Sequence, residues 1–149
     1  MKKSVLLWHP PEAMQALVLD VESYPSFLPW CNRAEVLERR PDGVTARLHL
    51  HYAGIRQSFT TRNVHHPDRS VSLSLVDGPF SMLEGLWRFA PIAVPGGTEP
   101  AACKVEFELR YAFANAVLEA AISPVFDRIA ETFVDSFVKR ADAVHGERR

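Results

Sequence analysis

Histidine and cysteine are the residue types that most often ligate metals or act as nucleophiles, and in this chain their spacing supports neither role. Of the six histidines, His49 and His51 stand two residues apart in an alternating segment, so both would project from one face of a strand. Two imidazoles are too few ligands for a zinc site. The strand face that carries them is the polar one, so we expect His49 and His51 to lie on the surface. Cys31 and Cys103 are far apart in the sequence, which fits reduced thiols in a core better than a disulfide framework. No metal site is therefore expected.

Sequence motifs for catalysis are also missing. The chain has no glycine-rich phosphate loop, no Cys-x-x-Cys pair and no Gly-x-Ser-x-Gly turn. Glu84 and Arg88 are adjacent on one face of a predicted strand, where an exposed ion pair is the ordinary interpretation. Because no general acid or base can be named, we expect a protein that is not an enzyme, with no catalytic residue and no required cofactor.

Aromatic side chains are the feature that points to a function. The chain has three Trp, three Tyr and nine Phe, and the strand and helix phases described below turn many of them toward one interior. For any single one, packing in a solid core is the better explanation, but the inward set as a whole carries almost no charge. A pocket lined by such residues would bind an apolar ligand at roughly 0.8 kcal/mol per buried methylene. We expect the ligand to be held by Tyr24, Phe27, Trp30, Phe59, Leu75, Phe80, Trp87, Phe107, Phe133 and Phe137.

Three members of this set have particular places in the expected pocket. Trp30 and Phe80 are expected near its mouth. The stretch from Tyr24 to Cys31 contains two prolines and is expected to form a stiff lid. From that lid, the Tyr24 hydroxyl would offer a hydrogen bond to a polar head group.

The middle of the chain has the period of two that strands require. From Ala34 to Ala114 apolar and polar residues alternate, with turn residues at 41–43, 66–68 and 77–79, which predicts a meander of about six strands. In the last strand every odd position from Cys103 to Phe113 is apolar and most even positions are charged. A short strand over residues 4–8 comes earlier, and residues 92–101 are expected to form a loop.

Helical spacing occupies both ends of the chain. A first helix is predicted from Pro11 to Asp20, and Pro25 and Pro29 allow at most a short helix or a pair of turns after it. A long apolar row from Leu118 to Phe137 predicts one amphipathic C-terminal helix with Asn115 as its cap. Pro124 is expected to kink or restart this helix, because proline removes one backbone hydrogen bond.

These elements predict an α+β fold in a single domain over residues 1–149, with a flexible tail at 145–149. With two short helices and one long one, an antiparallel sheet of six to seven strands must curve around the C-terminal helix to bury its apolar face. Side chains rarely fill the whole space between a curved sheet and one helix, so an apolar cavity is expected there.

Charge and hydropathy narrow the range of partners. The formal net charge is −1, which excludes a strong overall attraction to polyanions. The outward strand face has a modest basic bias, including Arg47 and Arg62, but glutamates dilute it and no aromatic residue interleaves to stack on bases, so DNA binding is not expected. Residues 5–8 are too short a run for a signal peptide, and no stretch of about 18 apolar residues occurs. We expect a cytoplasmic protein, free or peripheral to a membrane.

Three runs carry a family resemblance: residues 20–31 (DVESYPSFLPWC), 59–63 (FTTRN) and 75–80 (LVDGPF). Together with Trp87-Arg88-Phe89 and the closing helix, they resemble, over nearly the whole chain, the coenzyme Q-binding START-like family. That family belongs to the helix-grip, polyketide cyclase-like superfamily, and its bacterial members include a ribosome-association toxin. The resemblance implies the helix-grip fold, in which Pro124 is a departure from the expected closing helix.

The resemblance implies three functions, which differ in how well the residues support them. The preferred one is non-enzymatic binding of ubiquinone or a similar polyprenyl lipid, as a carrier or chaperone in respiratory electron transport, with contact to the inner membrane. The first alternative is a toxin that binds the large ribosomal subunit, blocks subunit association and inhibits translation. The second alternative is a polyketide cyclase or dehydrase, which rests on fold analogy alone.

Overall fold

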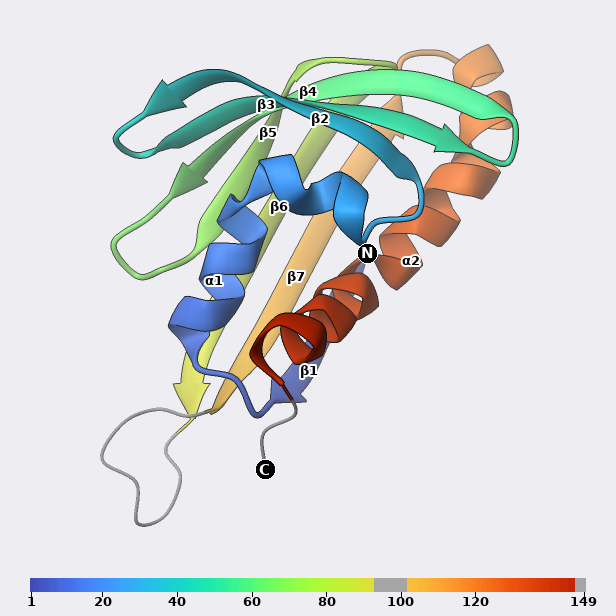
Figure 1. The fold of residues 1–149 in the computed structure, drawn as a ribbon. Helices are drawn as coiled ribbons and strands as arrows, with labels where there is room; N and C mark the ends of the chain where they lie inside the picture. Colours follow the sequence, from blue (N-terminus) through green and yellow to red (C-terminus); the bar gives the residue numbers. More distant parts are fainter. Residues whose placement is uncertain (93–101, 147–149) are drawn as a thin grey trace.

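One antiparallel sheet of seven strands forms the body of the computed structural model, which describes residues 1–92 and 102–146. The strands lie in the order β1-β7-β6-β5-β4-β3-β2, so β2 to β7 form the predicted meander and β1 pairs with β7. The sheet curves, and the helices lie on its concave side, which confirms the predicted α+β class (Figure 1). The strands are β1 Lys2–Leu7, β2 Cys31–Arg40, β3 Gly43–Tyr52, β4 Ile55–His65, β5 Val71–Asp77, β6 Phe80–Ile92 and β7 Ala102–Phe113.

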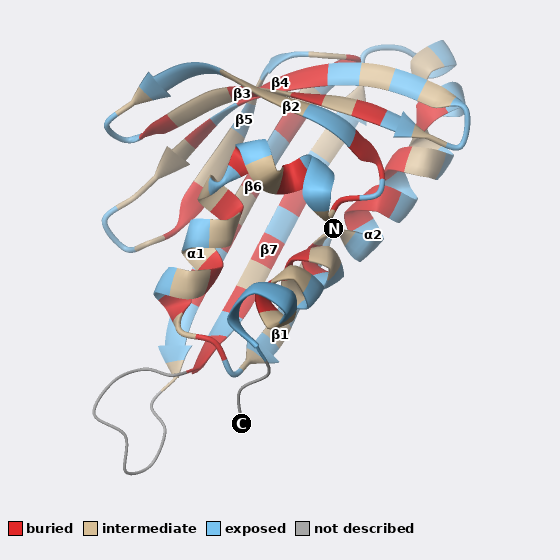
Figure 2. Ribbon diagram, in the orientation of Figure 1, coloured by how far each residue is buried: buried red, intermediate tan, exposed pale blue. Residues whose placement is uncertain are grey.

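Alternating burial along the strands determines which residues face the helices. In β7, Val105 and Phe107 are each 1 % exposed, whereas Lys104 before them and Arg110 after them are exposed. Phe107 lies directly opposite Trp87 of β6 in the strand register, so the inward rows of neighbouring strands coincide. The resulting stripes of buried residues cross the sheet (Figure 2). The predicted inward faces are therefore confirmed.

Two short helices carry the chain from one edge of the sheet to the other. Helix α1 (Pro11–Leu19) begins at the predicted proline, and the 3-10 helix η1 (Val21–Ser26) follows it. Because β1 and β2 form opposite edges of the sheet, this connection has to cross the concave face and covers part of it (Figure 1).

Helix α2 (Ala116–His145) closes the concave side. The Asn115 side chain accepts a hydrogen bond of 2.9 Å from the backbone N–H of Leu118, as predicted for a cap. The predicted tail starts later than expected, because His145 is still helical and Gly146 follows as the C-cap; residues 147–149 lie outside the described residues, as do 93–101 of the predicted loop. Among the helices that the structure describes, none is long and apolar enough to cross a membrane.

The expected restart of the helix at Pro124 is wrong, because α2 runs through this proline as one helix of 30 residues. Pro124 and Ala120, whose carbonyl loses its usual partner, are both exposed, so water can hydrate the freed oxygen. Ile122 and Phe126 on either side are buried at 2 % and 4 % exposure and pack both turns against the sheet. Packing on the sheet thus outweighs the missing hydrogen bond and keeps α2 continuous.

Candidate functional site

A pocket of about 60 Å³ lies between the concave face of the sheet and α2. Its wall comes from β3 to β7, from the segment around η1, and from the middle of α2, and it is almost entirely apolar. The lining residues are Tyr24, Trp30, Leu48, Phe59, Thr61, Asn63, Leu73, Leu83, Trp87, Phe107, Leu109, Phe126, Ile129, Ala130 and Phe133.

Six of the ten predicted ligand-holding residues meet in this wall: Tyr24, Trp30, Phe59, Trp87, Phe107 and Phe133. All of these rings except that of Tyr24 pack in one connected group, with centroid distances of 4.4 Å from Trp87 to Phe107, 5.3 Å from Phe107 to Phe133 and 6.1 Å from Trp30 to Phe133. The strand and helix phases placed these residues on one interior, and their mutual packing turns that interior into a continuous aromatic wall.

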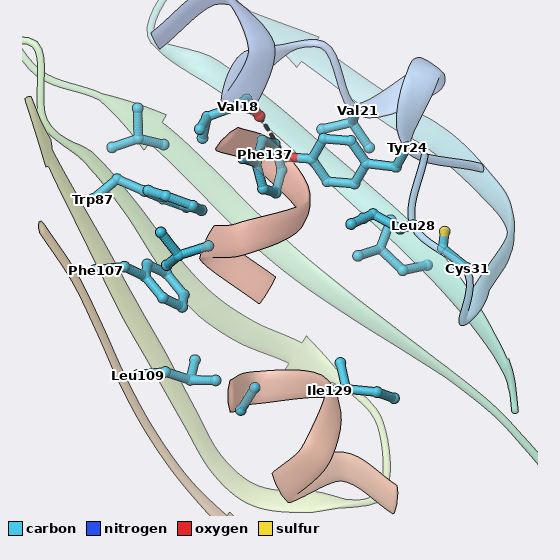
Figure 3. Close-up of a cluster of buried hydrophobic side chains, with 14 of the residues drawn as sticks. Val18, Val21, Tyr24, Leu28, Cys31, Trp87, Phe107, Leu109, Ile129 and Phe137 are labelled. Atoms are coloured by element: carbon cyan, nitrogen blue, oxygen red, sulfur yellow. Dashed lines mark hydrogen bonds between the residues drawn. The ribbon is translucent and has the colours of Figure 1, made fainter. Parts of the chain in front are cut away.

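The other four predicted residues lie outside the wall. Phe137 is fully buried, with its ring 5.1 Å from Trp87, and belongs to the solid core next to the pocket (Figure 3). Phe27 is half-buried and packs against that core, with its ring 5.0 Å from Phe137. Phe80 packs against Phe126, with the ring centroids 5.0 Å apart. Leu75 is half-buried on β5.

The predicted role of the Tyr24 hydroxyl does not hold, because this group already donates a hydrogen bond to the backbone carbonyl of Val18 (Figure 3). Val18 lies in the last turn of α1, where carbonyl groups have no partner within the helix. Tyr24 therefore caps α1 from the inside. Burial also holds the pKa of Tyr24 well above its usual value, so the phenol stays neutral.

Two polar residues in the wall, Thr61 and Asn63, were not among the predicted site residues. They are 4 % and 6 % exposed, and the Thr61 hydroxyl donates a hydrogen bond of 2.7 Å to Asn63 Oδ1. Both share the inward phase of β4 with Phe59, so following that strand beyond its aromatic residue would have found them.

The size of the pocket limits what it can enclose. A cavity needs roughly 10–15 Å³ to admit one water molecule. A volume of 60 Å³ therefore accommodates only a few water molecules or part of one small ring. Some of this space exists because position 85 is glycine. A methyl group there would lie 3.0 Å from Leu73 Cδ1 and 3.4 Å from Leu109 Cδ1, and both leucines line the pocket.

Both cysteines are buried free thiols, in agreement with the core role expected for them. Burial raises the pKa of Cys31 and of Cys103 to about 11. The thiols are therefore protonated at neutral pH and are poor nucleophiles or metal ligands.

The outer face of the sheet has a second, polar site. A broad hollow of about 550 Å³ lies over the end of the β3–β4 hairpin. Its lining includes His49 and His51, so this pair lies at the surface, as predicted. The lining residues are Asn32, His49, Leu50, His51, Arg56, Gln57 and Ser58.

Charge is unevenly divided over the sheet, with the hollow on its basic half. Strands β2, β3 and β4 carry six arginines against two glutamates, whereas β1, β5, β6 and β7 carry five basic residues against four acidic ones. Glu35 is shared by Arg33 at 2.8 Å, Arg47 at 3.9 Å and His49 at 3.6 Å. The predicted modest basic bias is thus concentrated on β2 to β4.

Both halves contain paired and unpaired charges. The paired arginines of the basic half are Arg33, Arg39, Arg40 and Arg47. On the other half, Arg88 is exposed and forms no ion pair with a described residue. On the balanced half, Lys104 pairs with Glu106 at 3.2 Å and Arg110 with Glu84 at 4.0 Å. Arg56 and Arg62 on β4 are exposed, and neither forms an ion pair with any residue that the structure describes. These two guanidinium groups are free to bind an anion.

A curved antiparallel sheet that grips a long C-terminal helix, with an apolar pocket between them, defines the helix-grip class of START-like proteins. A model of the family described as polyketide cyclase/dehydrase and lipid transport matches residues 7–138. The chain belongs to this family, which confirms the resemblance inferred from its sequence motifs.

Several known proteins resemble the chain over most of its length. It is 40 % identical over 146 residues to the persistence and stress-resistance toxin PasT of Escherichia coli, covering 98 % of this chain and 89 % of that protein. It is 37 % identical over 145 residues to the ribosome association toxin RatA of Pseudomonas aeruginosa, covering 97 % of this chain and 96 % of that protein.

More distant likenesses come from two other groups. The coenzyme Q-binding protein COQ10 homolog B of Xenopus laevis is 29 % identical over 136 residues, which are 91 % of this chain and 54 % of that protein. The crystal structure of the Zhui aromatase/cyclase from a Streptomyces species superposes with a TM-score of 0.79 at 16 % identity, covering 95 % of this chain and 92 % of that one. At that identity the likeness concerns the fold alone.

Proposed function

We propose that the protein associates with the ribosome and inhibits translation. The observation that carries this proposal is the identity of 37–40 % over nearly the whole chain with proteins named for ribosome association or toxicity. Ubiquinone binding came first among the hypotheses drawn from the sequence, but the named relative for it is more distant and is matched over 54 % of its length. The order of the two hypotheses is therefore reversed, and the proposed site of action is the cytoplasm, where ribosomes are.

The basic half of the outer sheet supports this proposal. Ribosomal subunits expose RNA phosphates, and clustered arginines bind phosphates in a way that weakens as salt rises. The surplus of arginines on β2 to β4 and the hollow beside Arg56 provide such a surface.

Co-sedimentation with purified large ribosomal subunits tests the proposal. We expect the protein to pellet with the subunits at low salt, to be released as the salt concentration rises, and to reduce the formation of complete ribosomes from subunits. Absence of the protein from the pellet at the lowest salt concentration would refute it.

A second function, binding of an apolar ligand, is supported by the pocket. Fifteen mostly apolar residues surround a space between the sheet and α2, and a relative is named as a coenzyme Q-binding protein. The volume of about 60 Å³ suits part of a ring and not a whole polyprenyl lipid. A prenyl tail, including one delivered from a membrane surface, would require wall residues to move.

Titration with a ubiquinone carrying one isoprene unit tests this second function. Trp30 and Trp87 line the pocket, so the quinone should quench their fluorescence in a Trp8→Phe variant, which lacks the exposed third tryptophan. Gly85→Ala places a methyl group against Leu73, and we expect roughly five-fold weaker binding, since overpacking costs about 1 kcal/mol or more. Quenching that is absent, or equal for both variants, would argue against this pocket.

The cyclase or dehydrase alternative has the least support. Tyr24 is the one titratable side chain among the lining residues described for the pocket, and its proton is held by Val18. A cyclase or dehydrase needs a group that moves protons at its substrate. We therefore propose that the protein is not an enzyme.

A further inference from the structure

We propose that Asn63 and Thr61 form a docking point for the carbonyl oxygen of an apolar ligand. The inference rests on the ligand-binding function proposed above and names the chemistry that the pocket selects. Two polar side chains that are 4 % and 6 % exposed stand in an otherwise apolar wall, where buried polar side chains are as a rule hydrogen-bonded.

The hydrogen-bonding groups of this pair are mostly donors. The Thr61 hydroxyl donates to Asn63 Oδ1, and Asn63 Nδ2 donates to no residue that the structure describes. A hydroxyl and a primary amide have three donor hydrogens between them, and their mutual bond uses one. The count is the same if the amide is turned over, so the pair keeps two hydrogens for an acceptor in the pocket.

The position of the pair is fixed by the sheet. Asn63 lies in β4 opposite Val44 of β3 and Leu73 of β5, so strands hold its backbone on both sides. The contact with β3 is close: a Cβ atom at Gly43 would lie 1.9 Å from the Asn63 carbonyl oxygen, and only glycine fits there. A donor held in place before the ligand arrives loses little entropy on binding.

The wall then defines the class of ligand. It offers no charged side chain among the described lining residues, so an ionised head group would be buried without a counter-charge. A pure hydrocarbon would leave the amide hydrogens unpaired. A neutral apolar body with a carbonyl oxygen, as in a quinone or an aryl ketone, satisfies both conditions.

Acetophenone and α-methylstyrene are suitable probes, because they have nearly the same shape and one carries C=O where the other carries C=CH₂. Both are larger than the enclosed 60 Å³, so each requires the same movement of the wall, and this requirement cancels in a ratio of their affinities. The quantity to measure is the ratio of their dissociation constants, obtained by NMR titration of the full chain. We expect Asn63→Leu to shift this ratio toward the hydrocarbon by roughly 3- to 10-fold, the range that one hydrogen bond supplies. Thr61→Val should shift it in the same direction by a smaller factor, because the amide loses the group that orients it.

Thr60→Val is the matched control. Thr60 is on the same strand and is 3 % exposed, but its hydroxyl accepts from Arg47 on the outer face of the sheet. The ratio should not change in this variant. In the native protein the side-chain amide resonances of Asn63 should shift with acetophenone and not with α-methylstyrene, a test that needs no variant to fold.

The outcomes separate the two proposals. If both probes bind and the ratio is the same in the native protein and in Asn63→Leu, the docking point is refuted while ligand binding stands. If the Asn63 amide resonances do not respond to bound acetophenone, the docking point is likewise refuted. If neither probe binds at millimolar concentration, ligand binding by this pocket fails, and the docking point with it.

Discussion

Replacing Trp87 with alanine is expected to lower the free energy of unfolding by about 3–5 kcal/mol, the usual cost of deleting a buried tryptophan. Trp87 is 1 % exposed, and its ring lies 4.4 Å from Phe107 and 5.1 Å from Phe137 (Figure 3). The ring of Phe133 is 5.7 Å away. The indole thus joins β6, β7 and α2 at the centre of the molecule. Urea unfolding followed by circular dichroism measures the effect.

Trp8→Ala is the matched control, because Trp8 is 53 % exposed. Its removal should change the free energy of unfolding by no more than about 0.5 kcal/mol. If Trp87→Ala lowers quinone affinity but leaves the unfolding free energy unchanged, Trp87 is a pocket residue and not also the core residue inferred from its contacts. If the two tryptophan variants lose equal stability, the central role assigned to Trp87 is wrong.

The inward aromatic set was predictable because it depends on local geometry. Side chains alternate along a strand and recur every three to four residues on a helix, so Trp87, Phe107 and Phe133 were placed on the interior without knowledge of the fold. Which of them face a pocket depends on how rings from different elements interlock. Phe133 and Phe137 are one helical turn apart on the same row, yet the first lines the pocket and the second is in the solid core.

Two other features depended on contacts that periodicity does not encode. The Tyr24 hydroxyl was expected to be available to a ligand, but the end of α1 lies within its reach and uses the proton. Pro124 was expected to kink or restart α2, but the helix does not restart there, because buried side chains on both sides hold it against the sheet. In both cases tertiary packing decided the outcome over a local preference.

The uneven outer face was missed although the sequence contained it. The outward residues follow from strand phase and the predicted meander gives the strand order, but the charges were averaged over the whole sheet. The strand order places Glu84, Glu106 and Glu108 on one half of the sheet, away from Arg56 and Arg62 on β4. A bias that is modest when averaged over the sheet becomes pronounced on β2 to β4.

Reversing charge on that half is expected to weaken ribosome binding by roughly 10-fold or more, because arginine–phosphate contacts that supply affinity are lost. Each lost contact also lowers the dependence of binding on salt. The double variant Arg56→Glu with Arg62→Glu replaces two exposed guanidinium groups on one face of β4. The two positions are six residues apart, which is roughly 20 Å along the strand. Neither arginine forms an ion pair with a described residue, so the change removes no internal contact of that kind. The slope of log K against log salt should fall by about two.

The control is Arg88→Glu with Arg110→Glu, which makes the same change in net charge on the balanced half of the same face. If ribosome binding follows the overall charge of the protein, both double variants will weaken it equally. If the basic half is the contact surface, the control will bind within about two-fold of the native chain, because a distant charge is screened beyond roughly 10 Å at 0.1 M salt. Equal losses would refute the surface on β2 to β4 but leave ribosome association intact, since co-sedimentation of the native protein tests that association separately.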